Sequence, residues 1–166
     1  VLVCVLPFSA FTYIEVLSSA KREQLLKALN NALSYIGGVP LSLKTDNMGQ
    51  VVKKSSRYEP SFDVLAEQWS AHYGCTLMAA RVRKPRDKAS AESHVNAIYN
   101  RVYAPLRNIV FHSIDQINEA FWKQLDMFNA RKMQHCDYSR RERFTLHEKS
   151  LLLPLPAEAF VPKNRV

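Results

Sequence analysis

The stretch that decides the fold is residues 41–47, Leu-Ser-Leu-Lys-Thr-Asp-Asn. Its apolar and polar side chains alternate, which is the pattern of a β-strand with one buried face. Asp46 stands at the carboxyl end of this strand, on the face opposite Leu41 and Leu43. Ligand sites in open α/β sheets gather at the carboxyl ends of strands. The stretch therefore predicts a strand that presents an acid where ligands bind.

A second acid, Glu92, follows the basic stretch at residues 81–88, Arg-Val-Arg-Lys-Pro-Arg-Asp-Lys. We predict a helix from about residue 87 to residue 103, which places Glu92 just inside that helix. Two carboxylates beside a cationic loop suit Mg²⁺-dependent chemistry on a phosphate backbone. A third carboxylate is expected with them, and the sequence offers no candidate for it.

Hydrophobic periodicity predicts the remaining elements. Strands are expected at residues 2–7, 11–17 and 75–80, and helices at residues 19–36, 61–73 and 113–128. Residues 50–59 lack an apolar period and are expected to form a mobile loop. The helical stripes predict the following core residues: Leu26, Leu29, Leu33, Ile36, Phe62, Leu65, Ala66, Trp69, Tyr73, Val95, Ile98, Val102, Leu106, Ile117, Phe121, Leu125 and Phe128.

Length and charge narrow the classes of protein. The chain has 166 residues, enough for one folded unit with a tail. Its net charge of +8 favours an anionic partner, either nucleic acid or an acidic membrane surface. The sequence has no apolar run of the roughly 18 to 20 residues that a membrane-spanning helix needs, so we predict no membrane association and a cytoplasmic protein. The three cysteines fit neither a disulfide framework nor a zinc site, and we expect them to be reduced and buried.

The beginning of the chain predicts that it is a piece of a longer protein. Val1 leads directly into a β-branched run, with no initiator methionine and no polar lead-in. The predicted order of elements is β-β-α-β-α-β-α-α, with Asp46 after the third strand and Glu92 after the fourth.

This order, with its motifs, resembles the ribonuclease-H-like catalytic core of DDE transposases and retroviral integrases, and within them the IstA-like insertion-sequence transposases. Three motifs carry the resemblance: the strand end at residues 43–47, the loop and helix start at residues 83–95, and the helix end at residues 128–131, Phe-Asn-Ala-Arg. The later stretch at residues 151–156, Leu-Leu-Leu-Pro-Leu-Pro, looks like the passage that links such a core to a C-terminal domain. The ordered set is more specific than any one motif.

The resemblance implies an α/β fold, a ribonuclease-H-like mixed sheet flanked by helices. Asp46 would be the second acid of the catalytic triad and Glu92 the third, and both would bind metal. The family's first acid lies on a central strand immediately before the hairpin with which this chain begins, so the chain is expected to lack that first, central strand. Residues 1–130 are expected to form this N-terminally truncated core, and residues 131–166 an extended tail toward a C-terminal domain.

The resemblance also implies a function and partners for the protein. The family cleaves transposon DNA ends and joins their 3′-hydroxyls to target DNA by phosphoryl transfer with Mg²⁺, for which Mn²⁺ may substitute. The implied partners are DNA, further copies of the chain in a homo-oligomer, and an AAA+ helper ATPase, in the bacterial cytoplasm at the nucleoid. The 166-residue chain alone is expected to be inactive, because the first catalytic aspartate is absent.

Basic residues near the two acids are candidates for contacts with DNA phosphates, which would be salt-dependent and largely independent of sequence. The alternatives are a solvated surface loop and, for Lys88, an ion pair with Glu92 one turn away. His94 is about 200° around the helix from Glu92 and is not expected to bind the same metal. The candidates for DNA contacts are Lys84, Arg86, Lys88, Arg83, Lys53 and Lys54.

Simpler interpretations remain open at this point. Asp46 could be an ordinary turn carboxylate and Glu92 a solvated helix residue. The scaffold could be a DNA-binding or assembly module without catalysis, since fold alone does not decide function, or a nuclease of the same fold. Aromatic residues could stack on bases, but aromatic stripes at helical spacing usually pack in the core. We therefore predict that Trp69, Phe121 and Phe128 are core residues and leave Trp122 as the exception.

Overall fold

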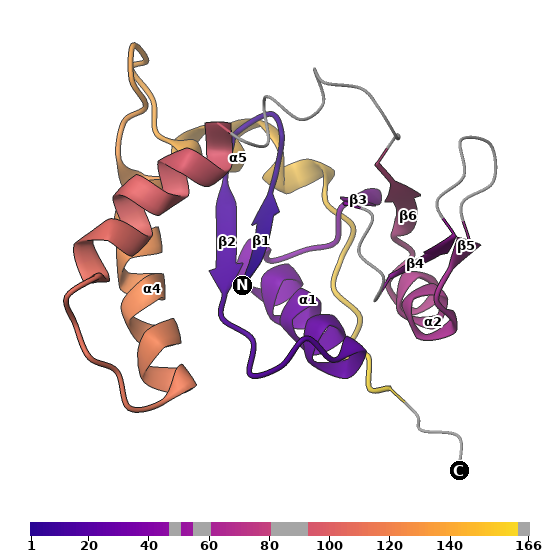
Figure 1. Cartoon of the computed structure of the whole chain (residues 1–166). Coiled ribbons are helices and arrows are strands. Elements are labelled where there is room, and N and C mark those ends of the chain that lie inside the picture. The colour runs from indigo at the N-terminus through magenta and orange to yellow at the C-terminus, as the bar shows by residue number, and fades with distance from the viewer. Residues whose placement is uncertain (47–50, 55–60, 81–92, 163–166) are drawn as a thin grey trace. The chain divides into compact units, whose positions relative to one another are not determined.

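The computed structural model describes residues 1–46, 51–54, 61–80 and 93–162 of the chain (Figure 1). The chain divides into two compact units, each made from segments far apart in the sequence. Unit 1 contains residues 1–18 and 84–150, and unit 2 contains residues 19–83 and 151–166. The sequence predicted one folded unit with a tail, and the structure instead assigns parts of that tail to both units.

Unit 1 begins with the predicted hairpin. Strand β1 (Leu2–Val5) pairs antiparallel with β2 (Thr12–Glu15), and Val5 lies opposite Thr12. The backbone N–H of Leu6 donates to the carbonyl of Phe11, 2.9 Å away, which continues the pairing toward the turn. Ile14 is fully buried, as its place in a β-branched run predicts.

Helix α4 (Ile114–Ala130) covers the outer edge of β2 with hydrogen bonds from its side chains. Asn129, fully buried, accepts from the N–H of Thr12 at 3.1 Å and donates to the Thr12 carbonyl at 2.8 Å. Asn118 makes the same pair of bonds with Val16, at 2.7 and 3.0 Å, and Trp122 donates to the carbonyl of Ile14 at 2.9 Å. An uncovered strand edge invites pairing with another chain, and these three side chains occupy this one.

The helix before α4 is described from residue 93 onward. Its α-helical part, residues 93–98, continues into a π-helical turn η1 (Tyr99–Tyr103) and a 3₁₀ turn η2 (Ala104–Leu106). The predicted core residues Ile98, Val102 and Leu106 are buried, but Val95 is 53% exposed, so the prediction for Val95 is wrong.

The tail expected from residue 131 onward contains a core element. Helix α5 (Arg140–His147) begins with a complete capping box between Ser139 and Glu142. Phe144 of this helix is buried and stacks on Phe11, with ring centroids 4.5 Å apart. Phe11 lies 133 positions earlier in the sequence, at the hairpin turn. Helix α5 therefore adds a buried residue to unit 1 where the sequence predicted an extended tail.

Unit 2 contains helix α1 (Arg22–Ile36), which buries the predicted residues Leu26, Leu29, Leu33 and Ile36. Gly37, with φ of +81°, ends the helix in the left-handed conformation that glycine adopts without strain. Gly38 packs against the later segment so closely that an added Cβ would lie 2.7 Å from the Cβ of Leu152. The predicted helix stop is therefore confirmed.

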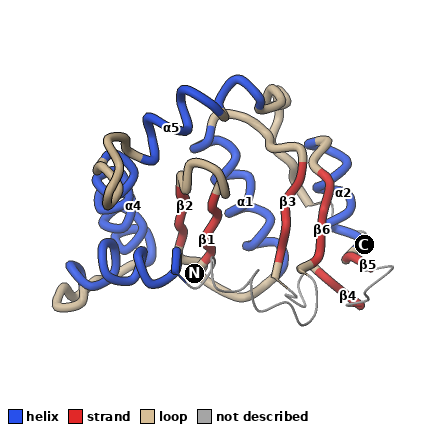
Figure 2. Tube along the Cα trace, turned by 90° about the horizontal axis from the view of Figure 1, so that it is seen from above, coloured by secondary structure: helices blue, strands red, loops and turns tan. Residues whose placement is uncertain are grey.

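The strand that carries the decisive stretch, β3 (Ser42–Thr45), pairs in parallel with β6 (Thr76–Ala79), beside which lies helix α2 (Val64–Tyr73) (Figure 2). Helix α2 buries Ala66, Trp69 and Tyr73, whereas Phe62 and Leu65 are only partly buried. A second pair, β4 (Val52–Lys54) with β5 (Ser61–Phe62), is antiparallel. The prediction of a mobile loop at residues 50–59 is wrong for residues 52–54, which form β4. Residues 50 and 55–59 lie outside the described part.

Residues 151–162 return to unit 2, where Val39 and Leu153 form an antiparallel bridge. Asn30 of α1 holds three groups at once. Its side-chain oxygen accepts from Trp69 and Tyr73, both at 2.9 Å, and its amide donates to the carbonyl of Phe160 at 2.8 Å. This asparagine joins α1, α2 and the later segment.

The strands confirm a mixed α/β fold with both parallel and antiparallel pairs. Within the described ranges, β1 pairs with β2 and β3 with β6, and no ladder joins β1 to β3. Among the described helices, none is long and apolar enough to cross a membrane.

Candidate functional site

The candidate site lies at the carboxyl ends of β3 and β6. Because the two strands run in parallel, their carboxyl ends share one edge. Thr45 lies opposite Ala79, and the N–H of Ala80 donates to the carbonyl of Thr45 at 2.9 Å. Asp46 follows Thr45 directly, and the basic stretch 81–88 follows Ala80 directly. The end of β6 therefore lies beside the end of β3, which Asp46 follows.

The side chains of β3 alternate as predicted near this end. Ser42, Lys44 and Asp46 are exposed, while Leu43 and Thr45 are partly buried. Leu41, placed on the buried face by the sequence pattern, is 69% exposed, so that part of the prediction is wrong. The pleat thus directs the Asp46 carboxylate to the accessible face.

The donor chemistry at this position fits a hard divalent cation. An accessible carboxylate supplies the oxygen ligands that Mg²⁺ prefers. Next to it, the hydroxyl oxygen of Thr45 is buried and has no hydrogen-bond partner within the described ranges. Across the described ranges, however, no three His, Cys, Asp or Glu residues stand close enough together to hold a metal ion. Asp46 could supply one ligand of a metal site, and the others must come from elsewhere.

The remaining predicted residues of the site fall mostly outside the described part of the chain. This applies to Glu92 and to the candidates for DNA contacts Arg83, Lys84, Arg86 and Lys88. The next helix is described from Ser93. His94, one residue later, is partly buried.

Lys53 and Lys54 lie on β4, and the structure gives Lys53 a partner that the sequence did not reveal. The Nζ of Lys53 is 3.9 Å from a carboxylate oxygen of Asp63, whose other oxygen lies 3.1 Å from the Nε of Arg22. Asp63 also caps α2 by accepting from the N–H of Leu65 at 2.9 Å. The Asp63 side chain is only 5% exposed, whereas that of Lys53 remains 55% exposed. Lys53 therefore has a structural contact and still faces solvent.

The aromatic predictions are largely confirmed. Trp69 and Phe128 are buried, and Phe121 is partly buried beneath Tyr103, with ring centroids 5.0 Å apart. Trp122, which we did not predict to be a core residue, is 36% exposed. Its indole N–H nevertheless donates to the carbonyl of Ile14 in β2.

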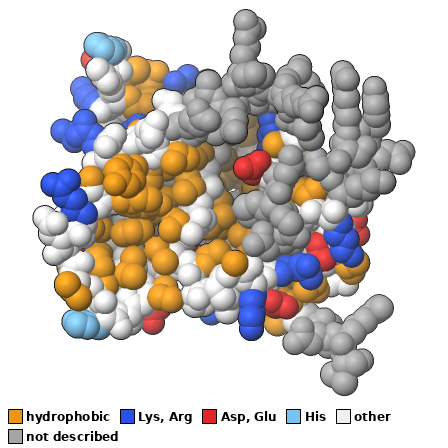
Figure 3. Space-filling model, viewed as in Figure 1, with side chains coloured by type: hydrophobic (Ala, Val, Ile, Leu, Met, Phe, Trp, Pro, Cys, Tyr) orange, Lys and Arg blue, Asp and Glu red, His pale blue; other side chains and the backbone are white. Residues whose placement is uncertain are grey.

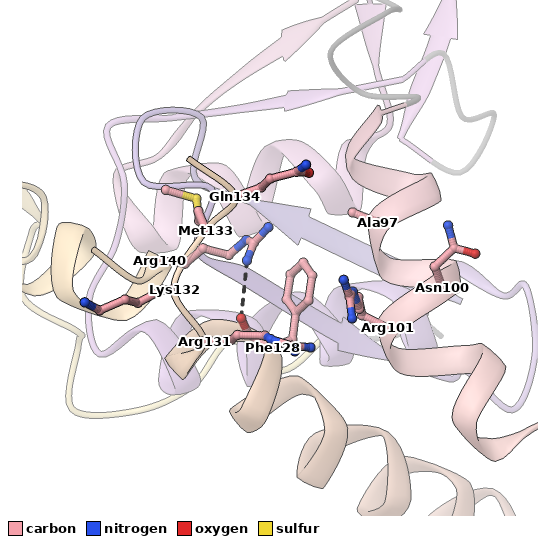
Figure 4. A pocket seen from close by; sticks show the side chains of 9 residues that line it. All are labelled: Ala97, Asn100, Arg101, Phe128, Arg131, Lys132, Met133, Gln134 and Arg140. Atoms are coloured by element: carbon pink, nitrogen blue, oxygen red, sulfur yellow. Dashed lines mark hydrogen bonds between the residues drawn. The ribbon is translucent and has the colours of Figure 1, made fainter. Parts of the chain in front are cut away.

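Sequence reasoning missed a cationic hollow in unit 1 (Figure 4). It lies between η1, the end of α4 and the start of α5. Its four cations come from three separate elements, and only the adjacent pair Arg131 and Lys132 gives a local signal in the sequence. The cationic side chains that line it are Arg101, Arg131, Lys132 and Arg140.

No model of a known protein family matches the chain. Curated relatives do match it along nearly its whole length. A protein named as a transposase for insertion sequence IS408 from Burkholderia multivorans is 32% identical over 96% of this chain and 31% of its own length. A protein named as a transposase from Sinorhizobium fredii is 34% identical over the same shares. A third, named for insertion sequence IS1162 from Pseudomonas fluorescens, is 33% identical over 96% of this chain and 28% of its own length. The chain thus spans about a third of the length of these relatives.

Solved structures share the fold. The catalytic core domain of BIV integrase superposes with a TM-score of 0.67 and 15% identity, covering 90% of this chain and 87% of that one. The HTLV-2 integrase catalytic core domain, solved in complex with magnesium in a trimeric form, gives a TM-score of 0.62 and 18% identity. That match covers 85% of this chain and 81% of the other.

Proposed function

Because this chain belongs to the insertion-sequence transposases and has the ribonuclease-H-like fold of retroviral integrase cores, we propose that it is the catalytic core of a DDE transposase. The whole protein would cleave transposon DNA ends and join their 3′-hydroxyls to target DNA. The observation that carries the proposal is the shared edge of β3 and β6, where the exposed acid Asp46 follows the end of β3.

Asp46 and Glu92 would hold the metal in this proposal. Bound Mg²⁺ would stabilise negative charge on the attacking and leaving oxygens of an in-line phosphoryl displacement. The exposed carboxylate of Asp46 fits the role of a ligand. Only two acids of this chain match the positions that the family pattern gives to its triad. We therefore expect the 166-residue chain to be inactive on its own and to need a further carboxylate.

The basic residues after β6 would position DNA beside the two acids. Lys84, Arg86, Lys88 and Arg83 follow β6, the strand that pairs with β3, in the sequence. Lys53 and Lys54 of β4 would contribute further phosphate contacts. The 55% exposure of the Lys53 side chain leaves room for such a contact despite its ion pair with Asp63.

Partners follow from the same proposal. We expect the protein to act as a homo-oligomer and to work with an AAA+ helper ATPase. Hydrophobic side chains gather on one face of unit 1, over α4 and the helix before it (Figure 3). Tyr99 and Met127 of these elements are 59% and 57% exposed. Exposed apolar patches often mark interaction surfaces, which supports assembly of several chains.

The proposal also places the boundary of the core. We propose that the catalytic core extends beyond residue 130 to about Ser150, because α5 packs Phe144 against Phe11 of the hairpin. Residues 151–166 would then be the passage toward a further domain.

A strand-joining assay tests the activity. In a longer protein that includes the segment upstream of Val1, Asp46→Asn and Glu92→Gln should each lower the joining rate at least about 10³-fold, equivalent to about 4 kcal/mol of transition-state stabilisation. Binding to transposon-end DNA should persist in both variants. Glu119→Gln, at an exposed acid on α4, should join at the wild-type rate. Wild-type joining by either site variant would show that the acids are wrongly assigned.

One observation favours a second candidate, a DNA-binding or assembly module without catalysis. The apolar side chains of Tyr99 and Met127 are 59% and 57% exposed on unit 1, as at an assembly surface. Calorimetric titration of the longer protein with Mg²⁺ or Mn²⁺ separates the two functions. Metal binding that disappears in Asp46→Asn supports the transposase, and the absence of metal binding supports the module.

A further inference from the structure

The cationic hollow of unit 1 has a volume of about 680 Å³ and is drawn in Figure 4. It is built from three elements that meet at one place. The helix and its π-turn η1 contribute Ala97, Asn100 and Arg101. The end of α4 contributes Phe128, and α5 contributes its first residue, Arg140. Residues 131–134 close the remaining side.

The backbone around the hollow is held in place. Lys132 and Ser139 form an antiparallel bridge, and the N–H of Met133 donates to the carbonyl of Tyr138 at 3.1 Å. The N–H of Cys136 donates back to Met133, also at 3.1 Å. On the opposite side, the π-turn bonds the N–H of Ala104 to the carbonyl of Tyr99. Single π-turns inside helices are frequent at functional sites.

The charge of the hollow has one sign. Its nine lining residues include Arg101, Arg131, Lys132 and Arg140, and none of them is an acid. In the described part of the chain, none of these four cations makes an ion pair. The next residue in the sequence, Arg141, differs in this respect, because it does not line the hollow and forms an ion pair with Asp126 at 2.8 Å. Arg101, Arg131 and Arg140 lie close to one another in this hollow, and Lys132 adds a fourth positive charge at its rim (Figure 4). Like charges repel one another, and an anionic ligand would relieve that repulsion.

Arg140 is the centre of the site. Its guanidinium lies over the ring of Phe128, 3.8 Å from the centroid, and its Nη1 donates to the Phe128 carbonyl at 3.3 Å. Its Nε–H is buried and has no acceptor among the residues that the structure describes. Burial lowers the pKa of this guanidinium because the charged form loses water. A buried donor without an acceptor is costly, and an oxygen from a ligand would satisfy it.

We propose that this hollow binds the phosphodiester backbone of DNA, as a second contact in addition to the basic residues near Asp46. The inference rests on the proposed function, which supplies DNA as the partner. Arginine forks match phosphate oxygens, and the volume admits a phosphate with its adjoining sugars. Arg140 covers the face of Phe128, so that face is not available to stack on a base. The contact would therefore recognise the backbone and be independent of sequence.

Two charge-matched double variants of the 166-residue chain test the site. Arg131→Gln with Lys132→Gln removes two cations of the hollow. Lys123→Gln with Arg141→Gln removes two exposed cations from α4 and α5 that do not line it. Both variants lose two charges from a net charge of +8, so any general electrostatic effect is the same in both. The affinity for a fluorescent double-stranded DNA is measured by anisotropy across a series of salt concentrations.

The hollow variant should bind DNA at least about tenfold more weakly at 0.1 M salt, and its log–log salt slope should fall by about 2. The control variant should keep the wild-type slope. A further variant, Arg140→Lys, keeps the charge but loses the fork, and it should weaken DNA binding while a thermal melt shows the fold intact.

Three outcomes would overturn the inference. Equal affinity and slope in the two double variants would show that the hollow makes no DNA contact. Loss of inorganic phosphate binding with unchanged DNA binding would identify a site for a small free anion instead. If the wild-type chain does not bind DNA, neither the hollow nor the basic residues near Asp46 make the proposed DNA contact. The inference fails separately from the catalytic proposal, because that proposal is tested by joining in Asp46→Asn and Glu92→Gln.

Discussion

Both units are held together by an asparagine that bridges segments more than a hundred residues apart, but the two asparagines do different work. In unit 1, Asn129 is fully buried and bonds both backbone groups of Thr12. In unit 2, Asn30 is partly buried and bonds two side chains, Trp69 and Tyr73, together with one carbonyl of the later segment. The first asparagine closes a strand edge, and the second ties a segment to two helices.

The difference shows where each unit is closed and where it is open. The outer edge of β2 is satisfied by side chains of α4, so nothing further can pair there. The carboxyl end of β3 keeps Asp46 exposed, and the chain leaves β6 beside it. In unit 1, asparagine side chains close the edge of β2. In unit 2, the candidate catalytic acid lies at the open carboxyl end of β3.

The largest effect is expected for Asn129→Ala. This change leaves the buried N–H and carbonyl of Thr12 without partners, which should lower the free energy of unfolding by about 2–4 kcal/mol. Denaturant unfolding measures the loss, and hydrogen exchange at the Thr12 amide localises it to unit 1. Asn129→Asp keeps the acceptor for the Thr12 N–H but buries a carboxylate against the Thr12 carbonyl, so it should destabilise the fold at least as much as alanine. A smaller loss in Asn129→Asp than in Asn129→Ala would contradict the bond that the Asn129 amide donates.

A smaller effect is expected for Asn30→Ala. Asn30 itself is only partly buried, so water can replace part of its bonding, and the loss should be about 1–2 kcal/mol. Hydrogen exchange should quicken at the Phe160 amide, which donates to the Tyr73 hydroxyl at 3.1 Å. The exchange at Thr12 should stay unchanged. A loss larger than that of Asn129→Ala would reverse the ranking of the two units.

The mildest substitution at the β2 edge is Trp122→Phe. It keeps an aromatic ring and removes only the N–H that donates to the Ile14 carbonyl. A single neutral hydrogen bond is worth about 1 kcal/mol, and partial exposure of Trp122 should reduce that value. Thermal unfolding measures the shift. A destabilisation as large as that of Asn129→Ala would mean that the ring packing, rather than the bond, holds this edge.

The thiols of Cys4, a partly buried residue, and of Cys75, a buried one, extend the comparison to alkaline pH. Burial, with a smaller effect of Glu15, raises the pKa of Cys4 in unit 1 from 9.0 to about 12, and burial raises that of Cys75 in unit 2 to about 11. A raised folded pKa stabilises the fold below the unfolded value and loses that contribution as pH rises from about 9 toward 12. Stability should therefore decline above about pH 9, and less steeply in Cys4→Ala. An identical decline in that variant would exclude Cys4 as a cause.

The sequence predicted the features that depend on local pattern. Alternation around Leu43 and Thr45 placed β3, and Gly37 marked the end of α1. The edge bonds of Asn129 were beyond prediction, because the asparagine and its strand are 117 residues apart. Helix α5 was missed because it buries a single aromatic residue, Phe144, which gives no period to detect.

The candidate site was predictable to a similar degree. Asp46 was found because a strand end is a local signal, and its exposure agrees with that prediction. The ion pair of Lys53 with Asp63 was missed because it joins β4 to the start of α2 across ten positions with no regular spacing. The cationic hollow was missed for the same reason, since its arginines come from three separate elements.

Manganese binding in the longer protein tests the central claim most directly. Paramagnetic Mn²⁺ broadens the NMR signals of amides near its site, and Thr45 and Ala80 lie beside Asp46. We expect the amides of Asp46 and Ala80 to broaden in the wild-type protein and to stay sharp in Asp46→Asn, while the Thr12 signal of that variant matches the wild type without metal. Amides at this edge that stay sharp in the wild-type protein, or that broaden equally in Asp46→Asn, would contradict the assignment of Asp46 as a metal ligand.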